Sequence, residues 1–141
     1  MSRSLHSCVI FGRSSKIYRQ IKHKLAEIFS IYEIDRANLN SVVNYLKLRP
    51  KYIYIFTGLV TNDPNMLSDV EKAHKRIINL ICDQKDTKVV LISSSAVYGN
   101  HKDYFSESDV CKPVNNYGAS KLRIEKMYQK KISSNLIILR L

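Results

Sequence analysis

Short apolar runs alternate with longer amphipathic stretches along this chain. A continuous apolar run is typical of a buried parallel strand, whereas apolar residues spaced three and four apart are typical of a helix with one buried face. The runs predict strands at residues 8–11, 31–35, 52–56, 89–92 and 136–139. The stretches predict helices over about 17–28, 39–46, 70–81 and 117–130, with a loop between residues 93 and 116. This order predicts an α/β fold with a doubly wound parallel sheet in a three-layer α/β/α arrangement.

Glycine and polar residues stand at or just beyond the ends of the predicted strands. They are Gly12, Asp35, Thr57, Gly58 and Ser94. Ligands of parallel α/β sheets bind at the carboxyl ends of the strands, so we expect these residues to share one rim. The alternative, that strands simply end in polar turn residues, accounts for only some of them.

Length and composition favour one globular domain over residues 1–141. The chain is 45% apolar and 25% charged, as is usual for globular proteins. No apolar run approaches the roughly 20 residues of a membrane helix, and no signal-peptide pattern opens the chain, so we expect a cytoplasmic protein. Cys8, Cys82 and Cys111 have neither disulfide-framework nor zinc-ligand spacing, so we expect reduced thiols and no metal site.

The net charge of +11 favours polyanionic partners. Lysines and arginines are spread along the chain without a basic block, which disfavours nucleic acid and an anionic membrane. Two interpretations remain. The charge is either an ordinary solvated, lysine-rich surface or an attraction for a dinucleotide or sugar nucleotide.

A tyrosine and a lysine four residues apart share one face of a helix, where both can reach the same pocket. An ammonium group beside a phenol favours the phenolate, which makes the tyrosine usable as a general acid or base. Three pairs have this spacing: Tyr18/Lys22, Tyr98/Lys102 and Tyr117/Lys121. Only Tyr117/Lys121 lies on a predicted helix that follows a serine-rich strand end. We therefore expect the chemistry there, with the hydroxyl of Ser94 opposite.

The second half of the chain resembles the extended short-chain dehydrogenases, and within them the NAD-dependent epimerase/dehydratase branch. The matching segments are Val89-Val90-Leu91-Ile92-Ser93-Ser94-Ser95-Ala96-Val97-Tyr98-Gly99, Glu107, Pro113, Tyr117-Gly118-Ala119-Ser120-Lys121, Glu125 and Leu139-Arg140-Leu141. The resemblance implies a Rossmann-like domain that binds NAD or NADP and acts on a nucleotide sugar. It also implies that Ser94 orients the substrate, Tyr117 is the acid/base, and Lys121 lowers the pKa of Tyr117 and contacts the nicotinamide ribose. A homodimer is plausible by the same resemblance.

The first turn departs from the Gly-x-x-Gly-x-x-Gly pattern of that family. Gly12 is present, but Ser15 and Tyr18 occupy the other two positions. Ser15 can still donate to phosphate, and Arg13 and Lys16 add positive charge. The bulky ring of Tyr18 is expected to push the helix outward or to fill part of the site.

The family pattern also suggests residues for the rest of the cofactor site. Asp35 lies where the acid that binds the cofactor ribose is expected, while Arg36 beside it could favour the 2′-phosphate of NADP, so both cofactors remain candidates. A turn residue without a ligand is the alternative for Asp35. Thr57 and Gly58 replace the family's usual paired small residues after the third strand.

Family members continue well past the last strand seen here, so the chain resembles the N-terminal part of a longer pattern that lacks most of the substrate domain. Two functions follow. The chain is either an NAD(P)-dependent epimerase, dehydratase or reductase, or the cofactor half of one, or it is a non-catalytic Rossmann-like binding or regulatory module. Nucleic-acid binding is a third, weaker hypothesis that depends on charge alone.

Overall fold

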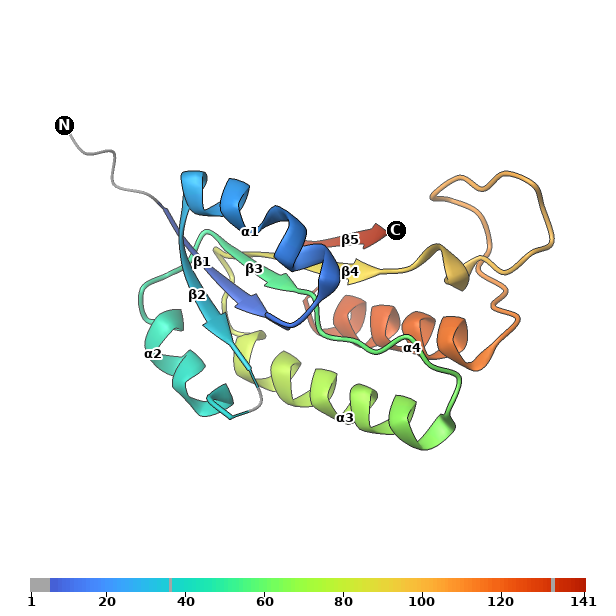
Figure 1. The fold of residues 1–141 in the computed structure, drawn as a ribbon, viewed down its shortest axis with the longest axis horizontal. Helices are drawn as coiled ribbons and strands as arrows, with labels where there is room; N and C mark the ends of the chain where they lie inside the picture. Colours follow the sequence, from blue (N-terminus) through green and yellow to red (C-terminus); the bar gives the residue numbers. More distant parts are fainter. Residues whose placement is uncertain (1–5, 36, 133) are drawn as a thin grey trace.

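The computed structural model describes residues 6–35, 37–132 and 134–141. Five parallel strands form one sheet in the order β2-β1-β3-β4-β5 (Figure 1). The strands are β1 (His6–Phe11), β2 (Phe29–Ile34), β3 (Tyr52–Ile55), β4 (Lys88–Ser93) and β5 (Leu136–Arg140). The helices are α1 (Lys16–Ile28), α2 (Val42–Leu46), α3 (Pro64–Ile81) and α4 (Asn116–Lys131), with single 3-10 turns η1 (Leu39–Ser41) and η2 (Ser95–Val97).

The sheet lies between two helical layers, with α1 on one face and α2, α3 and α4 on the other (Figure 1). Successive residues of a strand point to opposite faces. Cys8 and Ile10 of β1 accordingly pack in the cluster that includes Tyr18 of α1, while Val9 and Phe11 pack with the other three helices. The predicted three-layer, Rossmann-like fold is confirmed.

Two helices differ from their predicted extents for local reasons. The stretch predicted over residues 39–46 divides into η1 and the five-residue α2. Helix α3 begins before the first apolar residue of its predicted stripe. Its start is set by Asp63, whose Oδ1 accepts from the backbone N–H groups of Asn65 and Met66, and by Pro64 in the first turn. The first turn also contains Leu67, which is buried three residues before Val70, so the apolar stripe itself begins earlier than the predicted helix. None of the helices in the described ranges has the length and apolar character needed to cross a membrane.

The first turn of α4 lies directly against η2, the 3-10 turn that follows β4. Gly118 is buried there, and a Cβ atom at this position would overlap the Ala96 carbonyl oxygen and lie 3.1 Å from Cβ of Pro113. This glycine lets the helix start carrying Tyr117 approach the end of β4.

Replacing Gly118 with alanine is therefore expected to lower the free energy of unfolding by about 1–3 kcal/mol, because the new methyl group forces the helix away from η2. Urea unfolding followed by circular dichroism measures this change. If the close approach were unimportant, G118A would instead raise stability by about 1 kcal/mol, since alanine is the better helix former.

Candidate functional site

A cavity of about 860 Å³ lies at the carboxyl edge of the sheet, within the size range of small-molecule sites. The turns after β1, β2 and β3, the end of β4 and the start of α4 line it. Eight of the predicted site residues are among its lining residues: Gly12, Arg13, Ser15, Asp35, Thr57, Gly58, Tyr117 and Lys121. Ser94 is not among them, and Arg36 lies outside the described residues.

The turn after β1 is tight although two of the expected glycines are absent. Gly12 has φ +90°, and a Cβ atom there would lie 2.7 Å from the backbone nitrogen of Thr57. Only glycine adopts this conformation easily and allows the two strand ends to lie so close. Ser15 is the N-cap of α1: its backbone N–H donates to the Gly12 carbonyl at 3.0 Å, and its hydroxyl faces the Tyr18 N–H at 3.5 Å. Ser15 thus caps the first turn of α1 at a position where the family pattern has a glycine.

The ring of Tyr18 lies outside the cavity, so the expectation that it fills part of the site is wrong. It is fully buried between α1 and the sheet, 5.3 Å from the Phe56 ring, and its hydroxyl donates to Glu33 Oε1 at 2.7 Å. Burial first, and then the Glu33 carboxylate, raise the pKa of this phenol well above its usual range. Lys22 pairs with the same carboxylate at 2.6 Å. The Tyr18/Lys22 pair therefore stabilises the helix–sheet contact.

Asp35 is already bound to protein groups on the cavity wall. Its Oδ2 pairs with an Arg13 guanidinium nitrogen at 2.8 Å, and its Oδ1 accepts from the backbone N–H groups of Ala37 and Asn38. The carboxylate is therefore held in place beside a cation that projects from the glycine turn. An acidic and a basic group therefore line this part of the cavity together.

Tyr117 and Lys121, one turn apart on α4, line the same cavity. Lys121 is only 8% exposed, and its ammonium group donates to the Ile92 carbonyl at the end of β4 at 2.9 Å. Burial lowers the pKa of Lys121, and the nearby Glu125 carboxylate opposes that change. Asn62 Oδ1 accepts from the Tyr117 backbone N–H at 3.1 Å and helps to fix the helix start.

The two serines at the end of β4 have different surroundings. Ser93 lines the cavity, but its hydroxyl donates to Glu125 Oε1 at 2.5 Å. Ser94 is half-buried just beyond the strand, and its Oγ accepts from the Ala96 backbone N–H at 3.2 Å. That bond uses a lone pair and leaves the hydroxyl proton of Ser94 able to donate.

The third Tyr-x-x-x-Lys pair is divided between two separate interactions. The Tyr98 hydroxyl accepts from Arg140 at 2.8 Å, whereas Lys102 pairs with Asp109 at 2.6 Å. These residues lie in the connection between β4 and α4, outside any α-helix. Of the three pairs with this spacing, Tyr117/Lys121 is therefore the one that lines the cavity.

An ion pair with a buried carboxylate and a partly buried guanidinium joins α4 to β5. Both carboxylate oxygens of Glu125 accept from the Arg140 guanidinium, at 3.1 and 2.8 Å, and Glu125 is only 1% exposed. Ser93 joins the pair to β4 as well.

Sequence reasoning missed His74, which is fully buried on α3. Its Nδ1 lies 3.0 Å from the Tyr128 hydroxyl on α4, and its Nε2 lies 3.1 Å from the Thr57 carbonyl oxygen. Burial first, and then the charge of Lys121, lower the pKa of His74 to about 4. One signal could have found it, because position 74 falls on the apolar face of α3 between Val70 and Ile77.

The lowered pKa of His74 predicts a loss of stability in mild acid. As the pH falls, His74 takes up a proton at about pH 6.5 in the unfolded chain, but only near pH 4 in the folded chain. The stability that the neutral ring contributes is therefore complete above pH 6.5 and is lost as the pH falls toward 4. We expect the free energy of unfolding to fall by about 2–3 kcal/mol more in the wild type than in H74Q between pH 6.5 and 4.5. Urea unfolding over a pH series measures both slopes.

The carboxylates of Glu33 and Glu71 do not obscure the loss of stability expected between about pH 6.5 and 4.5. Burial acts to raise the pKa of Glu33 and of Glu71, but their bonds to Lys22 and Arg123 outweigh it, so both pKa values lie below 4.5. Their stabilising contribution is lost only at lower pH. Equal slopes for the wild type and H74Q would show that His74 does not titrate as its burial requires.

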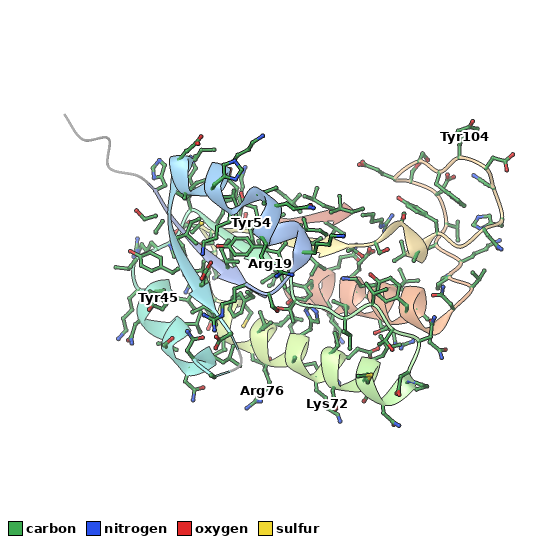
Figure 2. The ribbon with its side chains drawn as sticks, in the orientation of Figure 1. Arg19, Tyr45, Tyr54, Lys72, Arg76 and Tyr104 are labelled. Atoms are coloured by element: carbon green, nitrogen blue, oxygen red, sulfur yellow. The ribbon has the colours of Figure 1, made fainter. Side chains whose placement is uncertain are left out.

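Basic side chains lie on more than one face of the fold. Lys72 and Arg76 project from the outer side of α3, and Arg19 belongs to α1 on the opposite face of the sheet (Figure 2). Positive charge is thus distributed over different surfaces.

Within residues 6–35, 37–132 and 134–141, no three His, Cys, Asp or Glu side chains are grouped so that they could hold a metal ion. The three cysteines are free thiols, and Cys8 is buried.

A parallel sheet with a glycine turn after its first strand, and with a tyrosine and a lysine on one helix facing the same cavity, defines a Rossmann-like domain of the short-chain dehydrogenase type. The chain belongs to the NAD dependent epimerase/dehydratase family, whose model matches residues 3–141. A search of curated proteins found no match.

Solved structures share this fold. A dTDP-4-dehydrorhamnose reductase from Bacillus anthracis in complex with NADP superposes with a TM-score of 0.82 at 20% identity, over 99% of this chain and 54% of the reductase. A UDP-glucose 4-epimerase from Brucella ovis in complex with NAD gives a TM-score of 0.80 at 16% identity, over 96% of this chain and 51% of the epimerase. The chain thus spans about half the length of these neighbours.

Proposed function

We propose that this chain binds NAD or NADP in the cavity and serves hydride and proton transfer at a sugar carbon of a nucleotide-linked sugar. The observation that carries the proposal is that Tyr117 and Lys121 line the same cavity as the Gly12 turn. The family membership and the cofactors bound in two similar structures, NAD in the epimerase and NADP in the reductase, support it.

The residues of the first turns fit a dinucleotide. The start of α1 offers free backbone N–H groups and a positive dipole end to the pyrophosphate. Arg13 and Lys16 add charge at that place. Asp35 is the proposed partner of the adenosine ribose, and because Arg13 already neutralises it, we propose that the site accepts both NAD and NADP.

The residues of α4 and β4 fit acid–base chemistry. We propose that the Lys121 ammonium, which donates to the Ile92 carbonyl, contacts the nicotinamide ribose. Tyr117 is the proposed group that exchanges a proton with the sugar oxygen. Ser94 does not line the cavity, so its role as a hydrogen-bond donor to that oxygen is proposed from the family resemblance alone. The bound dinucleotide supplies a hydride acceptor or donor.

The substrate class is proposed from the similar proteins. The epimerase and the reductase are named for UDP-glucose and a dTDP-linked sugar, and a third neighbour, MoeE5, was solved with UDP-glucose and NAD at a TM-score of 0.73 and 22% identity. We propose a nucleotide sugar as the substrate, with epimerase, dehydratase or reductase activity. A cytoplasmic location and a homodimer are part of the same proposal.

Fluorescence titration with NADH and NADPH tests the proposal on the purified chain. We expect saturable binding of at least one of the two, with enhanced dinucleotide fluorescence as the nicotinamide ring leaves water. No saturable binding of either up to millimolar concentration would overturn the proposal.

A second candidate is a non-catalytic Rossmann-like binding or regulatory module. It is favoured by Ser15 and Tyr18, which stand in place of two glycines of the family pattern. Saturable dinucleotide binding, together with no hydride exchange between NAD(H) and UDP- or dTDP-linked sugars, would support this candidate over the enzyme.

A further inference from the structure

His74 lies where three parts of the site meet, although it does not line the cavity itself. It comes from α3, contacts the Tyr128 hydroxyl of α4, and contacts the Thr57 carbonyl just after β3. We propose that His74 is a positioning residue that holds the Thr57–Gly58 segment in the geometry required for dinucleotide binding. The inference rests on the proposed function for its effect on affinity, but its structural part can be tested independently.

The two contacts define the state of the imidazole ring. A carbonyl oxygen can only accept, so Nε2 must carry the proton that is donated to Thr57. In the neutral ring Nδ1 is then an acceptor, and it receives the Tyr128 hydroxyl proton. Burial and the neighbouring Lys121 charge disfavour the protonated ring. Facing groups from α4 are thus Tyr128 and Lys121, and Glu71 faces His74 from α3 itself.

The hydrogen bond from His74 to the Thr57 carbonyl affects two parts of the cavity wall, the glycine turn and Lys121. On one side, a Cβ atom at Gly12 would lie 2.7 Å from the Thr57 backbone nitrogen, so the glycine turn has no free space against this segment. On the other side, a Cβ atom at Gly58 would lie 3.5 Å from Nζ of Lys121, so the ammonium lies directly against Gly58. A shift of the Thr57 peptide would therefore change the positions of the phosphate turn and of Lys121 together.

Packing alone does not explain a histidine at this position. The neighbouring buried positions of α3 are apolar, as Val70, Ile77 and Ile81 illustrate. An imidazole there must be desolvated, and that cost is compensated only by hydrogen bonds to it. The polar side chain therefore indicates that the Thr57 carbonyl is held in a specific place.

Two variants with amide side chains, H74Q and H74N, each remove one of the two hydrogen bonds that His74 makes. The side-chain nitrogen of glutamine lies as many bonds from Cα as Nε2 of histidine, so H74Q keeps a donor for the Thr57 carbonyl and loses the acceptor for Tyr128. The side-chain oxygen of asparagine corresponds to Nδ1, so H74N keeps the acceptor for Tyr128 and loses the donor for Thr57. Each variant lacks one of the two bonds, which makes them matched controls for stability.

We expect the Kd for NADH, measured by fluorescence titration at neutral pH, to stay within about twofold of the wild type in H74Q and to rise about tenfold in H74N. In ¹⁵N-labelled protein, the amide signals of Gly12 and Gly58 should shift in H74N and remain near their wild-type positions in H74Q. A similar Kd for H74N and H74Q, or equal amide shifts in both, would overturn the proposal.

Two results keep this test separate from the proposed function. If the wild type bound no dinucleotide, the proposed function would fail, while the amide shifts would still decide whether His74 holds Thr57. If a variant failed to fold, the tautomer of the His74 ring in the wild type would test the proposal instead. It is measured by long-range ¹H–¹⁵N correlations of the imidazole. A proton on Nε2 supports the proposal, and a proton on Nδ1 overturns it.

Discussion

Replacing Glu125 with leucine is expected to lower the free energy of unfolding by about 3–5 kcal/mol, the usual cost of leaving one partner of a buried ion pair uncompensated. The Arg140 side chain is 19% exposed and donates to both carboxylate oxygens, and the Ser93 hydroxyl would lose its acceptor as well. The hydrogen bonds to Glu125, and further contacts with Tyr98, raise the pKa of Arg140 beyond its usual range, so the guanidinium stays charged.

The double variant E125L/R140L is the control for this prediction. It removes both charges, so we expect it to recover most of the stability lost in E125L. Urea unfolding followed by circular dichroism measures the wild type, both single variants and the double variant. A loss below about 1 kcal/mol in E125L would show that the pair does not join α4, β4 and β5 as the structure indicates.

Replacing Lys121 with methionine is expected to raise the Kd for NADH by about tenfold or more, because hydrogen bonds to a charged group contribute about 1.5–3 kcal/mol. Methionine keeps most of the volume and removes a buried charge, so we expect only a small change in stability. Lys126 lies exposed on the same helix, and K126M is the matched control.

Fluorescence titration of the wild type, K121M and K126M provides the comparison. Only K121M should lose affinity. Equal affinities for all three proteins would remove Lys121 from the cofactor site, and an equal loss in both variants would indicate a general effect of positive charge.

The fold could be predicted from the sequence because each strand and helix is marked by its own apolar pattern. The five strands, the four helical stretches and the grouping of Gly12, Asp35, Thr57 and Gly58 at one edge all follow from local periodicity and from the rule for parallel sheets. Glycine at position 12 could be assigned to a tight turn for the same reason. The structure adds that this turn lies against the segment after β3.

Other features depend on contacts that no local pattern contains. The sequence could not show whether the Tyr18 ring enters the site or packs beneath α1, because that depends on space beside Phe56. It could not show that Ser93, and not Ser94, lines the cavity, since neighbouring residues at the end of a strand point in different directions. The bond from His74 to Thr57 joins residues that are far apart in the chain.

If the proposed function holds, the nicotinamide ring of the bound cofactor lies beside Tyr117 of α4. Intermolecular nuclear Overhauser effects between the nicotinamide protons of bound NAD(H) and the ring protons of Tyr117 measure this directly, with Y117F as the control for assignment. We predict effects from the nicotinamide ring to Tyr117, and from the adenosine end to residues near Asp35. Saturable binding in which the nicotinamide protons contact other residues and not Tyr117 would contradict the account.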